Sequence, residues 1–84
     1  MPQHFSKLVT TDYGSLNFYF NSINIAGEMC YHISTVNKQG RSVYLLMENR
    51  IGRWVLQSPE SYPDWIVRLE EIFNQIIQKK IKAA

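Results

Sequence analysis

The chain has little cysteine, the residue whose disulfides stabilise small secreted domains, and it has no long apolar run. It has a single cysteine, Cys30, among 84 residues, which excludes an internal disulfide, whereas secreted domains of this size normally carry several. No stretch approaches the roughly 20 apolar residues that span a bilayer. The start, Met1–Phe5, lacks the charged residues and apolar core of a signal peptide. We therefore expect a cytoplasmic protein that has no membrane segment.

Charge and motifs exclude further classes of function. Nine Lys and Arg against seven Asp and Glu give a formal net charge of +2, far from the clustered basicity of a strong nucleic-acid binder. The sequence has no glycine-rich phosphate loop, no pair of catalytic carboxylates in a recognisable frame and no nucleophile elbow. We therefore expect neither enzymatic activity nor a cofactor.

Apolar residues, in contrast, are plentiful. They make up 45% of the chain, and aromatic residues make up 13%, which is sufficient for a packed core and excludes a disordered polypeptide. A chain of this length has room for one domain, residues 1–84, and its small core provides modest stability. Self-association is one way in which such a domain gains stability.

The clearest predicted element is an amphipathic helix over residues 61–82. Ser61 and Asp64 can form a capping box at its start, and Pro63 is tolerated in the first turn. Its apolar residues recur at spacings of three and four, as in a helix that lies on a core: Trp65, Ile66, Leu69, Ile72, Phe73, Ile76 and Ile77.

Upstream, the apolar period changes to two, which indicates β-strands. Residues 23–36 are predicted to form one long strand, bent at Gly27, whose odd positions face inward. Residues 16–20 form the strand before it, connected by a two-residue turn at Asn21–Ser22. This turn places Phe20 opposite Ile23 and Phe18 opposite Ile25.

The next hairpin loop is predicted at Lys38–Gln39–Gly40, because its last position needs a positive φ, which glycine adopts without strain. The loop aligns Ile33 with Leu45 and Tyr31 with Met47 on the inward face.

The last turn lies within Asn49–Gly52 and allows a loop of either three or four residues. A four-residue loop turns Trp54 and Leu56 inward, whereas a three-residue loop turns Val55 inward. We favour four residues, because burying an indole and a leucine removes more apolar surface from water, at about 25 cal/mol per Å². Trp54 and Trp65 should then both be largely buried.

The predicted fold class is α+β: a four-stranded antiparallel β-meander over residues 15–57, followed by one C-terminal amphipathic helix packed on one face of the sheet. Residues 1–14 have no clear pattern. Phe5, Leu8, Val9 and Tyr13 could form a short strand, or they could fold over the sheet as irregular cover.

The face of the predicted sheet away from the helix is half apolar. It comprises Tyr19, Cys30, His32, Ser34, Val36, Tyr44, Leu46, Arg53 and Val55. Because the second face of such a sheet is normally polar, it requires cover by the N-terminal segment or by a partner, unless its apolar residues are scattered exposures. We interpret Tyr19, Val36, Tyr44, Leu46 and Val55 as a surface that binds another protein or a second copy of the chain, as in a homodimer.

Glu28, Cys30 and His32 alternate along this face and bring a carboxylate, a thiol and an imidazole to successive positions. Catalysis by cysteine needs a base within hydrogen-bonding distance, whereas side chains two residues apart on a strand are about 7 Å apart at the backbone. Ordinary strand residues are the more frequent explanation of such a pattern. No further Cys or His cluster lies nearby in the sequence, so we predict no metal site.

Binding of single-stranded nucleic acid is the alternative function. Basic residues at two hairpin loops, Lys38, Arg41, Arg50 and Arg53, could contact phosphates while Tyr19 and Tyr44 stack on bases. The order of four strands and one helix is similar to that of the whirly-type and positive-cofactor single-strand-binding proteins, a resemblance in element order and not in any motif. The two loops lie at opposite ends of the third strand, so this function is our second choice.

Overall fold

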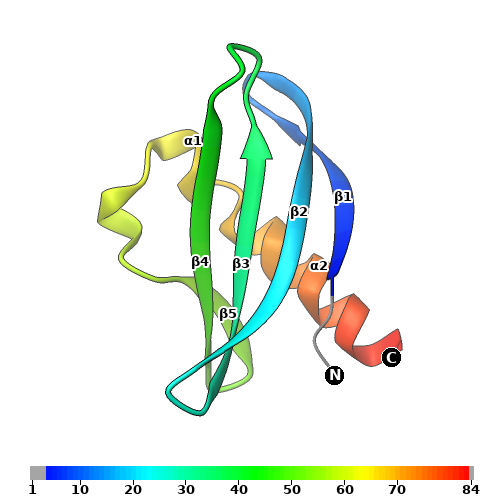
Figure 1. The fold of residues 1–84 in the computed structure, drawn as a ribbon, viewed down its shortest axis with the longest axis vertical. Helices are drawn as coiled ribbons and strands as arrows, with labels where there is room; N and C mark the ends of the chain where they lie inside the picture. The colour runs from blue at the N-terminus through cyan, green and yellow to red at the C-terminus, as the bar shows by residue number, and fades with distance from the viewer. Residues whose placement is uncertain (1–3, 84) are drawn as a thin grey trace.

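In a computed structural model that describes residues 4–83, the chain has an α+β fold (Figure 1). The strands are β1 (His4–Thr11), β2 (Gly14–Ile25), β3 (Glu28–Val36), β4 (Ser42–Arg50) and β5 (Arg53–Leu56). They are followed by a 3-10 helix, η1 (Pro59–Ser61), and by the helices α1 (Asp64–Val67) and α2 (Glu70–Ala83). All five strands form one antiparallel sheet in the order β1-β2-β3-β4-β5.

The sheet has five strands rather than the four predicted, because part of the N-terminal segment forms β1. All eight residues of β1 pair with β2, and Phe5 stacks on Phe20 with their ring centroids 4.7 Å apart. The strand alternative is thus confirmed for residues 4–11, which extend the sheet instead of covering it. Residues 1–3 of the predicted segment lie outside the described residues.

The predicted turn at Asn21–Ser22 is wrong, and the predicted bend at Gly27 is the turn itself. Ala26 and Gly27 form a two-residue turn with φ angles of 52° and 86°. Positive φ at both positions matches the right-handed twist of the flanking strands, and glycine adopts this conformation without steric strain. A turn at Asn21–Ser22 has no glycine, and these residues continue β2 instead.

The corrected turn shifts the pairing between β2 and β3. Phe20 lies opposite Ile33 and not Ile23, and Phe18 is not opposite Ile25. Ile25, which we predicted to point inward, is exposed next to the turn.

The predicted pairing of β3 with β4 is confirmed. Ile33 lies opposite Leu45 and Tyr31 opposite Met47. Gly40, the last residue of the predicted loop, has a φ of 80°.

The β4–β5 turn consists of two residues, Ile51 and Gly52, rather than the three or four that we considered. Their φ angles of 53° and 81° again fit a two-residue hairpin, and the Asn49 side chain accepts the Gly52 N–H at 3.0 Å. Loops of two and four residues leave the same strand face inward. Trp54 and Leu56 are therefore buried as predicted, each 3% exposed.

Ile51 is a strained residue at the tip of this hairpin. A β-branched side chain at a φ of 53° is an outlier, and this side chain is fully exposed, so burial does not offset the strain. Asparagine tolerates the conformation, so Ile51→Asn should raise the free energy of unfolding by about 1 kcal/mol. Ile51→Val keeps the branched side chain and should leave the urea midpoint unchanged. Equal midpoints for the two variants would refute the strain.

The C-terminal helix begins later than predicted and is interrupted. Pro63 is the N-cap of α1, no side chain caps the helix, and Ser61 lies instead in η1. Proline disfavours the helical conformation of the residue before it, and Tyr62 is accordingly extended, with φ −110° and ψ 150°. The helix therefore cannot start at Ser61, and α1 and α2 are separated at residues 68–69.

The inward face of the helix is largely as predicted. Its buried apolar residues are Ile66, Leu69, Phe73 and Ile77. Trp65 is half-buried, against the edge of Tyr13 with ring centroids 5.4 Å apart, so it is not largely buried as we predicted. Ile72, which we predicted on the inward face, is 42% exposed.

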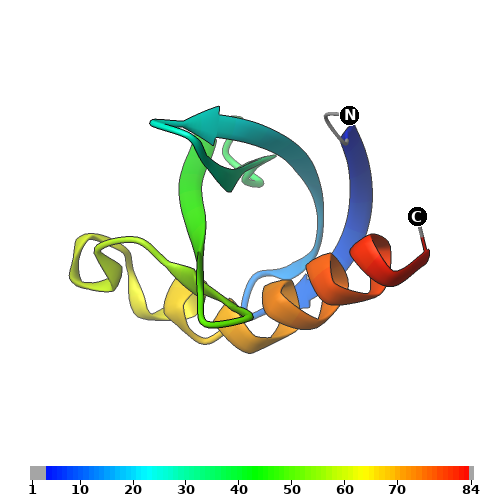
Figure 2. The same ribbon diagram turned by 90° about the horizontal axis from the view of Figure 1, so that it is seen from below.

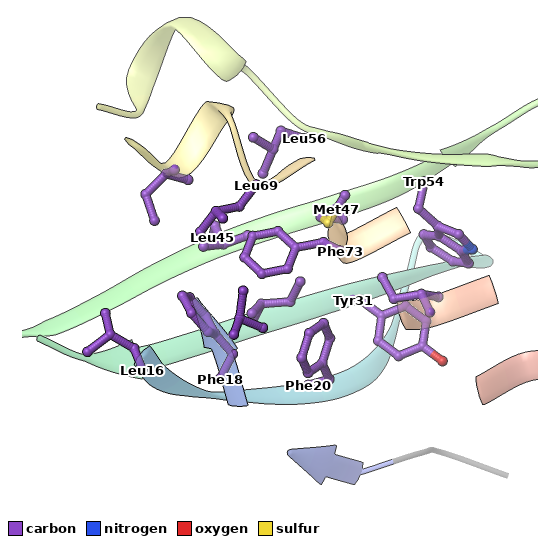
Figure 3. Packing of buried hydrophobic residues seen from close by; sticks show 14 residues of the cluster. Leu16, Phe18, Phe20, Tyr31, Leu45, Met47, Trp54, Leu56, Leu69 and Phe73 are labelled. Atoms are coloured by element: carbon purple, nitrogen blue, oxygen red, sulfur yellow. The ribbon is translucent and has the colours of Figure 1, made fainter. Parts of the chain in front are cut away.

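The sheet curls around α2, which lies against its concave side (Figure 2). The core fills the space between them (Figure 3), and its fully buried side chains include Phe18, Phe20, Tyr31, Ile33, Leu45, Met47, Ile66, Phe73 and Ile77. No described helix lies over the convex side of the sheet (Figure 2). None of the helices within residues 4–83 has the length and apolar character needed to cross a membrane.

Candidate functional site

The outer face, defined as the convex side of the sheet directed away from α2, carries exposed aromatic and apolar side chains. Strand pairing places Tyr19, Ser34 and Tyr44 in one row across β2, β3 and β4. Both tyrosines are exposed, Tyr44 to 60%, and Val36 is exposed farther along β3 on the same side. Three of the five predicted partner-binding residues therefore present their side chains together.

Polar neighbours hold both tyrosine rings in place. The His32 ring stacks on Tyr44 with centroids 5.5 Å apart and an interplanar angle of 30°. Asn17 donates its Nδ2 hydrogen to the Tyr19 hydroxyl at 3.3 Å. A ring that is already held loses less conformational entropy when a partner binds, so both rings are suited to recognition.

Leu46 and Val55 are half-buried. The four-residue loop that we predicted places them opposite each other, and this pairing is wrong. Leu46 lies opposite His32 as predicted, but its neighbour toward β5 is Gln57, whose N–H donates to the Leu46 carbonyl at 2.9 Å. Val55 lies opposite Glu48 instead. The two-residue β4–β5 turn causes this difference, because it shifts β5 by two residues relative to the predicted pairing.

Sequence reasoning missed Leu8, which extends the exposed surface onto β1. Leu8 lies opposite Asn17 and is 67% exposed. Its neighbour Val9 is buried in the core. Alternation of Leu8 with Val9 was the available signal, but it places Leu8 on the outer face only once residues 4–11 are recognised as a strand.

Cys30 is buried and is poorly suited to act as a nucleophile. Burial, followed by the charges of Glu48 and Glu28, raises the pKa of the Cys30 thiol above its ordinary value. The His32 ring stacks on Tyr44. Within residues 4–83, no group of three or more His, Cys, Asp and Glu side chains is arranged to hold a metal ion.

Iodoacetamide should therefore alkylate Cys30 slowly in the folded protein. A buried, protonated thiol is a poor nucleophile, so we expect a rate at least about tenfold below that of glutathione at neutral pH. Unfolding in urea should restore the rate of an ordinary thiol, and mass spectrometry of quenched samples measures both rates. A native rate above that of glutathione would indicate a depressed thiol pKa and would make Cys30 and His32 a candidate catalytic pair again.

The basic residues of the alternative nucleic-acid site lie at opposite ends of β4. They are Lys38 and Arg41 at one end and Arg50 and Arg53 at the other. Glu48 pairs with Arg50 at 2.9 Å and Glu71 pairs with Arg53 at 3.0 Å. These ion pairs neutralise the cations at one end, so the four residues do not form one basic surface.

A groove of about 350 Å³ lies where the β1–β2 turn, the β3–β4 loop and α1 meet. It is lined by Tyr13, Leu16, Asn37, Lys38, Gln39 and Trp65. An ion pair between Asp12 and Arg68, with N···O 2.6 Å, connects the turn to the end of α1. Sequence reasoning did not find this groove, because it joins three segments that are far apart in the chain.

No protein-family model, curated protein or solved structure matches the chain. The function is therefore inferred from the geometry of the chain itself.

Proposed function

We propose that this protein is a non-catalytic interaction module that binds a protein partner, or a second copy of itself, through the outer face. The observation that carries the proposal is the cluster of exposed Tyr19, Val36 and Tyr44 side chains on a side of the sheet over which no described helix lies (Figure 2). Residues 4–11 do not cover this side, because they extend the sheet as β1.

The chemistry of the outer face favours a protein over nucleic acid. Two rows of paired residues cross its centre: Ser6, Tyr19, Ser34 and Tyr44, and His4, Asn21, His32 and Leu46. Neither row contains Lys, Arg, Asp or Glu. Protein interfaces are depleted of charge at their centres and enriched in tyrosine, whereas nucleic-acid binding depends on cations that contact phosphates.

A double substitution, Val36→Asp with Tyr44→Asp, tests the proposal. It places two carboxylates at exposed positions of the outer face, where they should abolish partner binding and leave the thermal midpoint within a few degrees of the wild type. The matched control is Ile72→Asp, which adds a carboxylate at an exposed apolar residue of α2. Sedimentation velocity measures self-association, and affinity capture from native extract measures binding of another protein.

Nuclease treatment of the extract separates the two candidate functions. Under the proposal, the double variant loses the captured protein or its own dimer, the Ile72→Asp control keeps it, and nuclease has no effect. Capture that disappears on nuclease treatment would favour the nucleic-acid alternative. Equal association by the wild type and the double variant would contradict the proposal.

A further inference from the structure

The two edges of the sheet differ in how their backbone groups are satisfied. At β5, side chains of α2 occupy the edge. Asn74 Oδ1 accepts a hydrogen bond from the backbone N–H of Trp54 at 2.9 Å, and Glu70 Oε2 accepts one from the backbone N–H of Leu56 at 2.8 Å. This edge is therefore closed to a further strand, because its amide hydrogens already have partners.

The edge of β1 is open. Within residues 4–83, β1 has β2 as a neighbour on one side and no strand on the other, and no α2 side chain bonds to its backbone as happens at β5. In an antiparallel ladder, alternate residues direct their N–H and C=O groups to opposite sides, so half of these groups in β1 point away from β2. Edge strands are usually protected by proline, a bulge, short length or charged side chains, especially lysine. β1 has eight residues, pairs with β2 without interruption and contains no proline, and Lys7 is the only Lys, Arg, Asp or Glu among its residues.

A groove of about 300 Å³ runs beside this open edge. Phe5, Ser6 and Lys7 of β1 line one side, and Ile76, Lys79 and Lys80 of α2 line the other. Figure 2 shows β1 and the C-terminal half of α2 on the same side of the molecule. Lys80 Nζ lies 5.1 Å from the centroid of the Phe5 ring, so the groove combines an apolar floor with ammonium groups.

β1 and the C-terminal part of α2 carry lysines and no acidic side chains. Residues 4–11 and 72–83 contain Lys7, Lys79, Lys80 and Lys82 and no Asp or Glu. The ion pairs of the described residues all lie elsewhere, at Arg50, Arg53 and Arg68. The helix dipole explains lysines at the end of α2, but it does not explain Lys7, which faces them across the groove from β1.

This charge selects the kind of strand that can bind. A second copy pairing through β1 would bring the two Lys7 side chains and both sets of helix lysines together, and like charges on neighbouring strands are destabilising. An acidic segment has the opposite effect, because its carboxylates gain ion pairs and its backbone gains hydrogen bonds along β1.

We propose that an extended acidic peptide segment of a partner protein binds along β1 as an additional strand of the sheet. Its carboxylates contact Lys7, Lys79 and Lys80, and an apolar side chain lies over Phe5 and Ile76. This site is separate from the outer face, so either proposal can fail without the other.

Fluorescence anisotropy with a labelled peptide about eight residues long, to match β1, tests the proposal. Because Phe5 and Lys7 lie on the same face of β1, every second residue of the peptide is glutamate except one, which is valine, and the residues between them are threonine. We expect saturable binding, and a peptide with lysine in place of glutamate should not bind. Two further peptides carry N-methyl groups on one or the other set of alternate residues. Strand addition predicts that one set weakens binding about tenfold or more and that the other has little effect, because one edge of the added strand bonds to β1.

Matched charge reversals locate the site on the protein. Lys7→Glu with Lys79→Glu should weaken binding of the acidic peptide about tenfold or more, whereas Lys38→Glu with Arg41→Glu, the same change at one end of β4, should leave it unchanged. Circular dichroism verifies the fold of each variant. If the first pair does not fold, Lys7→Gln with Lys79→Gln replaces it and should still weaken binding.

The proposal would be overturned by no binding of the acidic peptide, by equal affinity for both N-methylated peptides, or by displacement of the acidic peptide by oligothymidylate that binds more tightly. The Val36→Asp, Tyr44→Asp variant should bind the peptide as the wild type does. Loss of peptide binding in that variant would place the peptide on the outer face and would also overturn this proposal.

Discussion

Phe73→Ala should lower the free energy of unfolding by about 3–5 kcal/mol, which is comparable to the whole stability of many small domains. Phe73 is fully buried at the centre of the core (Figure 3). Its ring meets Phe18 and Phe20 edge to face, with centroids 5.1 and 5.9 Å away. Truncation removes these contacts and leaves a cavity. A core this small has few other side chains that can move to fill it.

The neighbouring residue provides a control for helix propensity. Ile72→Ala lies in the same turn of α2 but on its exposed side, and alanine is the better helix former. We therefore expect an unfolding midpoint close to that of the wild type for Ile72→Ala and a large fall for Phe73→Ala, both measured by urea titration followed by circular dichroism. Similar midpoints for the two variants would show that α2 is not the centre of the core.

Local signals predicted the parts of the fold that depend on few residues. The 3.6-residue period identified the buried face of α2, and Gly40 fixed the loop that aligns β3 with β4. Gly27 was misread because a glycine inside an alternating run is compatible with either a bend or a turn. Choosing the turn required knowing that residues 21–25 continue β2 and pair with residues 28–32 of β3.

The β4–β5 turn shows why a correct face can accompany an incorrect pairing. Loops of two and four residues have the same parity, so burial of Trp54 did not depend on choosing between them. The partner of Val55 did depend on it, and that prediction was wrong. For β1, a strand was one of two alternatives, because Lys7 interrupts the apolar alternation between Phe5 and Val9.

Of the two candidate surfaces, the outer face could be predicted from the sequence and the open sheet edge could not. The outer face followed from alternation, and Tyr19, Val36 and Tyr44 could be named from the sequence alone. The difference between the two sheet edges could not, because it rests on Asn74 and Glu70, helix residues that reach β5 across the fold. No local pattern distinguishes a buried helix asparagine that bonds to a strand from one that faces solvent.

Asn74→Leu should lower the free energy of unfolding by about 2–3 kcal/mol, because it leaves the backbone N–H of Trp54 buried without an acceptor. Asn74 is buried, and its Oδ1 lies 2.9 Å from that nitrogen. The control is Gln75→Leu, which adds the same side chain at an exposed position. Urea titration of both variants measures the effect.

The pH dependence of this variant gives an independent test, because Asn74 also acts on Glu71. The hydrogen bond from Arg53, followed by the 3.1 Å bond from Asn74 Nδ2, lowers the pKa of Glu71 below its ordinary value. A carboxyl whose pKa is lowered by folding contributes stability above its unfolded pKa, and this stability is lost as the pH falls through the folded pKa. Asn74→Leu removes one of the two donors, so the variant has less of this contribution to lose. The difference in unfolding free energy between wild type and Asn74→Leu should therefore be larger at neutral pH than below the ordinary pKa of glutamate. A difference that stays constant or grows on acidification would show that Asn74 stabilises β5 without acting through Glu71.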